Sequence, residues 1–146
     1  MIQVGIVGAS GYSGAELMRL LVARPDVNIT KVIAGTSAGR RVDDLYPAFS
    51  GSIDLTFEPL DTSRLDGLDV VFVALPSGEG MNVVPQIMDR VERVIDLGGD
   101  FRLANAHLYE KFYGHEHTAP DLLGEAVYGL PELNKERIAG ARLIAN

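Results

Sequence analysis

The chain has 146 residues, of which 47% are hydrophobic and 23% charged, and this ordinary globular composition fits one domain. Its formal net charge of −7 makes nucleic acid and anionic membranes poor partners, so neither is expected. The lack of cysteine excludes disulfides, thiolate metal sites and a cysteine nucleophile within these residues.

The start of the chain predicts a strand, a glycine-rich turn and a helix. Residues 2–7 form a short apolar, β-branched run, which is typical of a buried strand. Glycines punctuate the turn that follows, and apolar residues then recur at helical spacing until Pro25. Ser13 and Glu16 fit a capping box, so we expect the helix to begin at this turn.

The remaining strands and helices alternate along the chain. Strands are predicted at 29–35, 55–58 (weaker), 70–75, 93–97 and 143–145, and a helix at 79–90, with Pro85 in its first turn or at a kink. The stretch 36–52 is polar, and 103–133 is interpreted as a long functional excursion without regular structure. This alternation predicts an α/β fold, a Rossmann-like doubly wound, mostly parallel sheet with helices on both faces.

The segments that follow the predicted strands share a composition. Residues 8–13, 35–41, 76–80 and 98–102 each carry Gly, Ser, Thr or Arg. Ligands of such sheets bind beyond the carboxyl ends of the strands, so we expect these segments to form one shared site.

The turn after the first strand is a candidate cofactor loop. Gly8, Gly11 and Gly14 are a spacing variant of the dinucleotide fingerprint, in which glycines let the backbone approach a pyrophosphate at a helix N-terminus. This interpretation is strengthened because the glycine turn directly follows an N-terminal strand. Ser10, Tyr12 and Ser13 are candidate phosphate donors. The alternative is a plain strand–helix turn that uses small residues for packing.

The end of the second predicted strand favours NADP(H) over NAD(H). NAD-preferring domains usually place Asp or Glu there, whereas this chain has Gly35, Thr36 and Ser37, with Arg40 and Arg41 just beyond. Small hydroxyls and guanidinium groups suit a 2′-phosphate. The alternative is a solvated loop with two incidental arginines.

Two aromatic and histidine patterns invite other functions. His115 and His117 alternate and could share a face of a strand, but no further ligands with convincing spacing accompany them, so we predict structural residues and no metal site. Tyr109, Phe112 and Tyr113 are predicted to pack together rather than to stack on bases.

Several segments together resemble the N-acetyl-γ-glutamyl-phosphate reductase family of semialdehyde dehydrogenases. They are residues 7–14 (VGASGYSG), 74–78 (ALPSG), 96–103 (DLGGDFRL), 113–117 (YGHEH), 128–133 (YGLPEL) and 144–146 (IAN). The segments occur in the family's order and span the chain. The chain departs from the family's pattern in two segments, since Ser77 stands where His is frequent and Gly98-Gly99 replaces Ser-Ala.

The resemblance implies an NADPH-dependent reduction of an acyl phosphate in arginine biosynthesis. In the family a cysteine thiolate displaces phosphate, hydride reduces the resulting thioester, and a histidine assists proton transfer. By motif match Ser10 to Ser13 hold pyrophosphate, and Pro76 and Ser77 lie near the nicotinamide ribose. Thr36, Ser37 and Arg40 hold the adenosine end, and Arg102 binds the substrate phosphate unless it forms a structural ion pair with Asp96 or Asp100.

The resemblance also implies a longer protein. The family's nucleophilic cysteine follows Ile-Ala-Asn directly, so we expect it just beyond Asn146, and we interpret residues 1–146 as a truncated NADP-binding domain without the substrate domain. A full-length homo-oligomer in the cytoplasm acting on a small acyl phosphate is expected. The alternatives are a stand-alone NADP-binding or sensing module and a related aspartate-semialdehyde or aminoadipate-type reductase.

Overall fold

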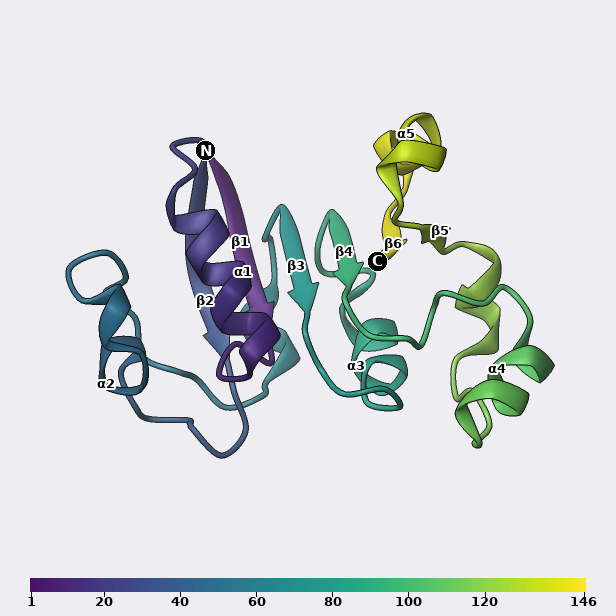
Figure 1. The fold of residues 1–146 in the computed structure, drawn as a ribbon, viewed down its shortest axis with the longest axis horizontal. Helices are drawn as coiled ribbons and strands as arrows, with labels where there is room; N and C mark the ends of the chain where they lie inside the picture. Colours follow the sequence, from purple (N-terminus) through teal and green to yellow (C-terminus); the bar gives the residue numbers. More distant parts are fainter.

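A computed structural model describes all 146 residues and contains one six-stranded sheet of order β2-β1-β3-β4-β6-β5 (Figure 1). Every neighbouring pair of strands is parallel. The strands are β1 (Ile2–Val7), β2 (Val27–Ile33), β3 (Val70–Val73), β4 (Arg93–Asp96), β5 (Val127–Tyr128) and β6 (Leu143–Ala145). The helices are α1 (Tyr12–Val22), α2 (Val42–Leu45), α3 (Gly80–Ile87), α4 (Ala106–Tyr113) and α5 (Pro131–Gly140), with 3₁₀ turns η1 (Pro47–Phe49), η2 (Thr62–Leu65) and η3 (Pro120–Gly124). None of the helices is long and apolar enough to cross a lipid bilayer.

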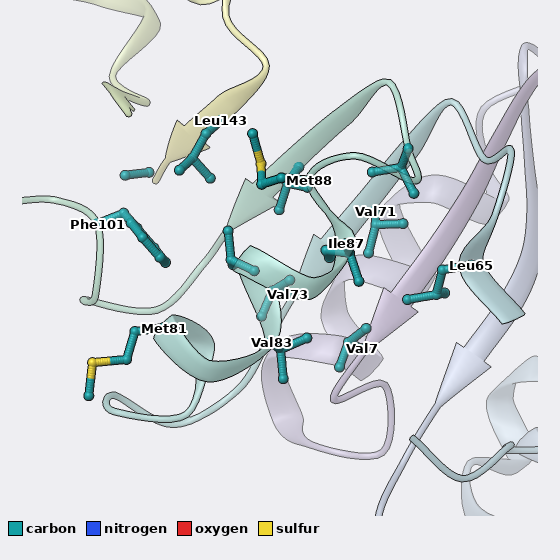
Figure 2. Packing of buried hydrophobic residues seen from close by; sticks show 14 of the residues in the cluster. Val7, Leu65, Val71, Val73, Met81, Val83, Ile87, Met88, Phe101 and Leu143 are labelled. Atoms are coloured by element: carbon teal, nitrogen blue, oxygen red, sulfur yellow. The ribbon is translucent and has the colours of Figure 1, made fainter. Parts of the chain in front are cut away.

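Two apolar cores cover the two faces of the sheet. Successive side chains of a strand alternate between faces, and Ile6 and Val7 accordingly belong to different cores. The first core joins β3 residues such as Val73 to Ile87 of α3, as Figure 2 shows. The second core contains Met18 of α1, which lies over β1 and β2 in Figure 1. The predicted doubly wound sheet with helices on both faces is therefore confirmed.

The chain leaves β1 and β3 in opposite directions. From β1 it passes through α1 to β2 at the edge, and from β3 it passes through α3 to β4 on the other side. Since β1 and β3 are neighbours, their carboxyl ends form the topological switch point of the sheet, which is the place where such sheets bind ligands.

The start of α1 differs from the predicted capping box. Gly11 is the N-cap residue and no side chain caps the helix, so Ser13 lies inside the first turn. Glu16 instead pairs with Arg19 at 2.6 Å. The reason is that Gly14 packs closely on Ala9, which brings residues 12–14 into the helix. A Cβ atom at position 14 would lie 2.6 Å from the Ala9 Cα atom.

Two other predicted elements differ from the observed ones. Residues 55–58 form no strand but only isolated bridges, Ile33 with Glu58 and Arg41 with Thr56. The helix predicted at 79–90 is shorter, and Pro85 lies in its interior rather than in its first turn.

The segment 103–133, predicted to lack regular structure, contains α4, η3, β5 and the start of α5. The side chain of Asn105 caps α4 by accepting hydrogen bonds from the amides of His107 and Leu108. Gly114 ends the helix with a φ of +80°, a left-handed conformation that suits glycine. The prediction was wrong here because these two capping signals, with only eight residues between them, were not used to mark a helix.

Candidate functional site

The turn between β1 and α1 presents backbone amides that have no acceptor within the chain. The amides of Gly8 and Ala9 donate to the Ile33 carbonyl oxygen, and that of Gly11 donates to Gly8. By contrast, the amides of residues 10, 12, 13 and 14 donate to no protein atom. Unpaired amides at a helix N-terminus bind anions, so the turn has the chemistry that a pyrophosphate requires.

The three glycines of this turn serve different purposes. Gly8 has a φ of +84°, and a Cβ there would lie 2.3 Å from the Ala74 carbonyl oxygen at the end of β3. Gly14 is held against Ala9 as described above. A Cβ at Gly11 would meet nothing closer than 3.5 Å. The fold therefore requires glycine at positions 8 and 14, whereas Gly11 leaves the outer side of the turn open to a ligand.

A cleft of about 310 Å³ lies at the switch point beside this turn. It is lined by Val7, Gly8, Ile33, Ala34, Gly35, Leu60, Leu75, Glu79, Asn82 and Val83. Glu79 belongs to the segment 76–80 that was expected to join the site, whereas the sequence did not single out Leu60 or Asn82. Leu60 follows the weaker predicted strand 55–58, so the rule that ligands bind beyond strand ends was a signal that could have found it. Asn82 lies in the first turn of α3.

The loop after β2 holds one unpaired arginine and one paired arginine. Thr36, Ser37 and Arg40 follow Gly35, which lines the cleft, and Arg40 is exposed with no ion pair. Arg41 lies 2.9 Å from Asp43 and 2.9 Å from a second carboxylate, that of Asp54. These carboxylates raise the pKa of Arg41 through hydrogen bonds and charge. Arg40 is therefore the guanidinium of this loop that is free for a ligand.

The loop after β3 is fixed by a buried carboxylate that the sequence did not single out for this role. Asp100 is completely buried and accepts hydrogen bonds from the Ser77 hydroxyl at 3.1 Å and the Gly78 amide at 2.8 Å. It also accepts from the Met81 amide at 3.0 Å and the Tyr109 hydroxyl at 2.9 Å. Because four donors surround Asp100, the loop that contains Pro76 and Ser77 has one defined conformation.

The histidines predicted as structural lie behind this loop. The His117 Nε2 atom donates to the Asp100 carbonyl oxygen at 2.9 Å, and its Nδ1 atom accepts from the Ala119 amide. Burial lowers the pKa of His117. The His115 Nε2 atom lies 3.2 Å from the Tyr109 hydroxyl, whose pKa burial raises to about 12. These contacts agree with a structural role, and no cluster of potential metal ligands is present.

The predicted aromatic cluster is confirmed for two of its three members. The rings of Tyr109 and Tyr113 stack with centroids 4.6 Å apart. Phe112 was predicted wrongly, because it is 69% exposed.

Arg102 spans the ends of two strands rather than forming the ion pair considered from the sequence. Its Nε atom donates to the Asn146 carbonyl oxygen at 2.9 Å and a terminal nitrogen donates to that of Leu97 at 3.3 Å. It pairs with neither Asp96 nor Asp100, since the oxygens of Asp100 already have four donors.

Asp96, at the end of β4, is a buried carboxylate with an unpaired oxygen. Its Oδ1 atom accepts from the Gly98 amide at 3.1 Å, whereas Oδ2 has no partner. Burial raises the pKa of Asp96 from 3.8 to about 6, and the nearby charge of Asp100 adds to this effect.

Comparison with protein families agrees with this geometry. The family model described as "Semialdehyde dehydrogenase, NAD binding domain" matches residues 3–141. The N-acetyl-gamma-glutamyl-phosphate reductase of Alkalilimnicola ehrlichii is 48% identical over 146 residues, which are all of this chain and 43% of that protein. That of Halorhodospira halophila is also 48% identical, over 42% of its length. The chain thus spans less than half the length of these curated relatives.

Solved structures support the fold. Aspartate semialdehyde dehydrogenase II of Vibrio cholerae, complexed with ASA, gives a TM-score of 0.67 at 20% identity and covers 100% of this chain and 41% of that one. The Candida albicans aspartate semialdehyde dehydrogenase with NADP gives 0.59 at 21% identity, over 70% of this chain and 31% of that one. At such identities the likeness establishes the fold alone.

The three glycines give a prediction about stability. We expect Gly8→Ala and Gly14→Ala each to lower the free energy of unfolding by about 3 kcal/mol or more, because a Cβ collides with backbone atoms. Gly11→Ala is the matched control and is expected to cost no more than about 1 kcal/mol, the usual loss for alanine at an N-cap. Urea unfolding of the three variants measures this. Equal losses of unfolding free energy at positions 8, 11 and 14 would contradict the conclusion that only Gly8 and Gly14 are required by the fold.

Asp96 gives a prediction about pH. The folded chain binds the Asp96 proton more tightly than the unfolded chain, so this group's contribution to stability is present below pH 4 and is lost as pH rises through about 6. Asp96→Asn removes this pH-dependent loss of unfolding free energy, which is on the order of 3 kcal/mol at most. Its melting temperature relative to the unaltered chain is therefore expected to rise between pH 4 and pH 7. Asp89→Asn, at a side chain that is 97% exposed, is the control. A pH-independent difference for Asp96→Asn would disprove the prediction.

Proposed function

The chain belongs to the semialdehyde dehydrogenase family as its NAD-binding domain, and on this basis we propose that it binds NADP(H) for the reduction of N-acetyl-γ-glutamyl phosphate. The observation that carries the proposal is the set of unpaired amides in the turn at the switch point. Residues 1–146 are proposed to act as one cofactor-binding domain of a longer enzyme.

The pyrophosphate is proposed to bind the turn 8–14. Its oxygens would accept from the amides of Ser10, Tyr12 and Ser13, with the helix dipole of α1 adding to the attraction. The hydroxyl groups of the same residues are further donors. Gly11 supports this role because its missing side chain leaves room on the outer side of the turn.

The preference for NADP(H) is proposed to come from Thr36, Ser37 and Arg40. The free guanidinium of Arg40 suits a 2′-phosphate. The acidic residue next to the end of β2 is Glu58, and its carboxylate lies 2.9 Å from Lys31 and 2.6 Å from Arg64. Because its carboxylate already pairs with two cationic side chains, Glu58 is poorly placed to bind the free ribose hydroxyls of NAD(H).

The nicotinamide end is proposed to lie at the loop after β3. The Ser77 hydroxyl donates a hydrogen bond to Asp100, so its oxygen remains available to accept one from a ribose hydroxyl. Pro76 next to it is exposed and adds no competing donor. Arg102 is exposed at the ends of β4 and β6, where its remaining guanidinium N–H groups are proposed to bind the substrate phosphate.

The overall reaction proposed is acyl phosphate plus NADPH plus a proton, giving the semialdehyde, NADP⁺ and phosphate. NADPH supplies the hydride when bound. This chain has no cysteine, so its own contribution is to bind and orient the cofactor and the phosphate. We further propose that the full-length enzyme is a cytoplasmic homo-oligomer that binds neither membrane nor nucleic acid. The acidic charge of the chain and the naming of its relatives as reductases support this.

Cofactor choice is tested by a pair of neighbouring arginines. Arg40→Ala is expected to weaken NADPH binding about tenfold or more and to leave NADH binding unchanged, because a charge-assisted bond to the 2′-phosphate is lost. Arg41→Ala is the matched control, since its guanidinium is already paired with Asp43 and Asp54. Fluorescence titration measures the affinities of the unaltered chain and of both variants for NADPH and NADH. Equal binding of NADH and NADPH by the unaltered chain would reject the preference.

The reductase activity is tested with a chimera. Residues 1–146 replace the matching 43% of the Alkalilimnicola ehrlichii reductase, to which they align from end to end. We expect phosphate-dependent reduction of NADP⁺ by the N-acetylated glutamate semialdehyde, which is the reverse reaction. A folded chimera that binds NADPH but turns over only the aspartate or aminoadipate analogue would favour those related reductases. One that binds NADPH and acts on none would favour a binding module.

A further inference from the structure

A tyrosine remote in sequence holds the turn between β1 and α1. The Tyr46 hydroxyl donates to the Ser10 carbonyl oxygen at 2.7 Å, across a separation of 36 residues. Its ring is half-buried and packs edge-on against Phe49, with centroids 6.1 Å apart and an interplanar angle of 79°. Phe49 is buried in the core that contains Met18 of α1, so Tyr46 is attached to the body of the domain.

This contact gives the Ser10 carbonyl oxygen its partner. The first hydrogen bond of α1 runs from the Ala15 amide to the carbonyl of the N-cap residue Gly11, so the Ser10 carbonyl, one residue earlier, accepts from no helix amide. The phenol of Tyr46 satisfies this carbonyl instead. The amides that the helix start leaves unpaired, those of residues 10, 12, 13 and 14, therefore lie beside a peptide whose orientation Tyr46 fixes.

The peptide unit between Ser10 and Gly11 is held both at its oxygen and at its N–H. Its oxygen accepts from Tyr46, and its N–H, that of Gly11, donates to the Gly8 carbonyl at 3.1 Å. A carbonyl dipole turned toward a bound phosphate would repel it, so fixing this peptide also keeps its oxygen in one defined direction.

Tyr46 lies on the segment that carries the groups proposed to bind the 2′-phosphate. Between Arg40 and Tyr46 the backbone is tied to residues 55–57 by three hydrogen bonds, from Gly39 to Phe57, from Phe57 to Arg40 and from Val42 to Leu55. Val42 is completely buried. This segment is therefore a rigid connection with Arg40 at one end and the Tyr46 hydroxyl at the other.

We propose that Tyr46 is a positioning residue for the cofactor's pyrophosphate, which holds the turn 8–14 in its anion-binding conformation and couples it to the 2′-phosphate loop. This inference rests on the proposed cofactor binding and adds a residue that acts through the Ser10 carbonyl of the turn. A purely structural tyrosine would affect all ligands of the domain alike, whereas a positioning residue affects only those that reach the turn.

The test is Tyr46→Phe, which removes the hydroxyl and keeps the ring. Its affinity for NADPH is expected to fall about three- to tenfold, the value of one hydrogen bond. Its affinity for adenosine 2′-phosphate, which has a 2′-phosphate but no pyrophosphate, is expected to stay within about twofold. Tyr128→Phe is the control, since Tyr128 lies on β5 and its hydroxyl makes no hydrogen bond.

A second measurement needs no ligand. In Tyr46→Phe the peptide between Ser10 and Gly11 loses the bond to its oxygen, so hydrogen exchange of the Gly11 amide, which donates to Gly8, should become faster than in the unaltered chain. Unchanged Gly11 exchange, unchanged NADPH binding or equal weakening of both ligands would overturn the inference. Failure of the unaltered chain to bind NADPH would instead contradict the proposed function, so the two failures are distinguishable.

Discussion

The close approach of Gly8 to the carbonyl oxygen of Ala74 is the constraint on which the site depends. It brings the ends of β1 and β3 together at the point where the chain leaves the sheet toward opposite faces. Because no side chain fits between them, the turn before α1 runs close to the sheet and starts the helix with its amides unpaired. The cleft, the loop after β2 and the loop after β3 all border this contact.

An acidic chain can nevertheless offer a site for a polyanion, because three carboxylates beside the loop after β2 have partners. Arg41 binds Asp43 and Asp54, while Lys31 and Arg64 bind Glu58. The backbone amides of the turn and the guanidinium of Arg40 remain unpaired, and Glu79 is the one charged residue in the lining of the cleft. Local pairing of charges, rather than the net charge of −7, therefore governs what the site attracts.

The sequence predicted those features that are written in short stretches. The strand 2–7, the glycine turn and the apolar strand beginning at Val70 each carry a local pattern, and the structure contains all three. The four donors around Asp100 and the bond from Tyr46 to Ser10 join residues far apart, so no spacing rule reaches them. Helix α4 was missed although Asn105 and Gly114 mark its ends, because its apolar pattern extends over only eight residues. Local patterns thus located the site, and long-range contacts determined how its loops are held.

The central claim is that the turn at the switch point binds the pyrophosphate of a nicotinamide dinucleotide. Titration of the ¹⁵N-labelled chain with NADPH, followed residue by residue by NMR, tests it most directly. We expect the largest chemical-shift changes at the amides of residues 10–14, with further changes at Gly35 to Arg40 and at Ser77. Changes confined to the opposite end of the sheet, around the cleft lined by Asn28 and Ile53, would contradict it.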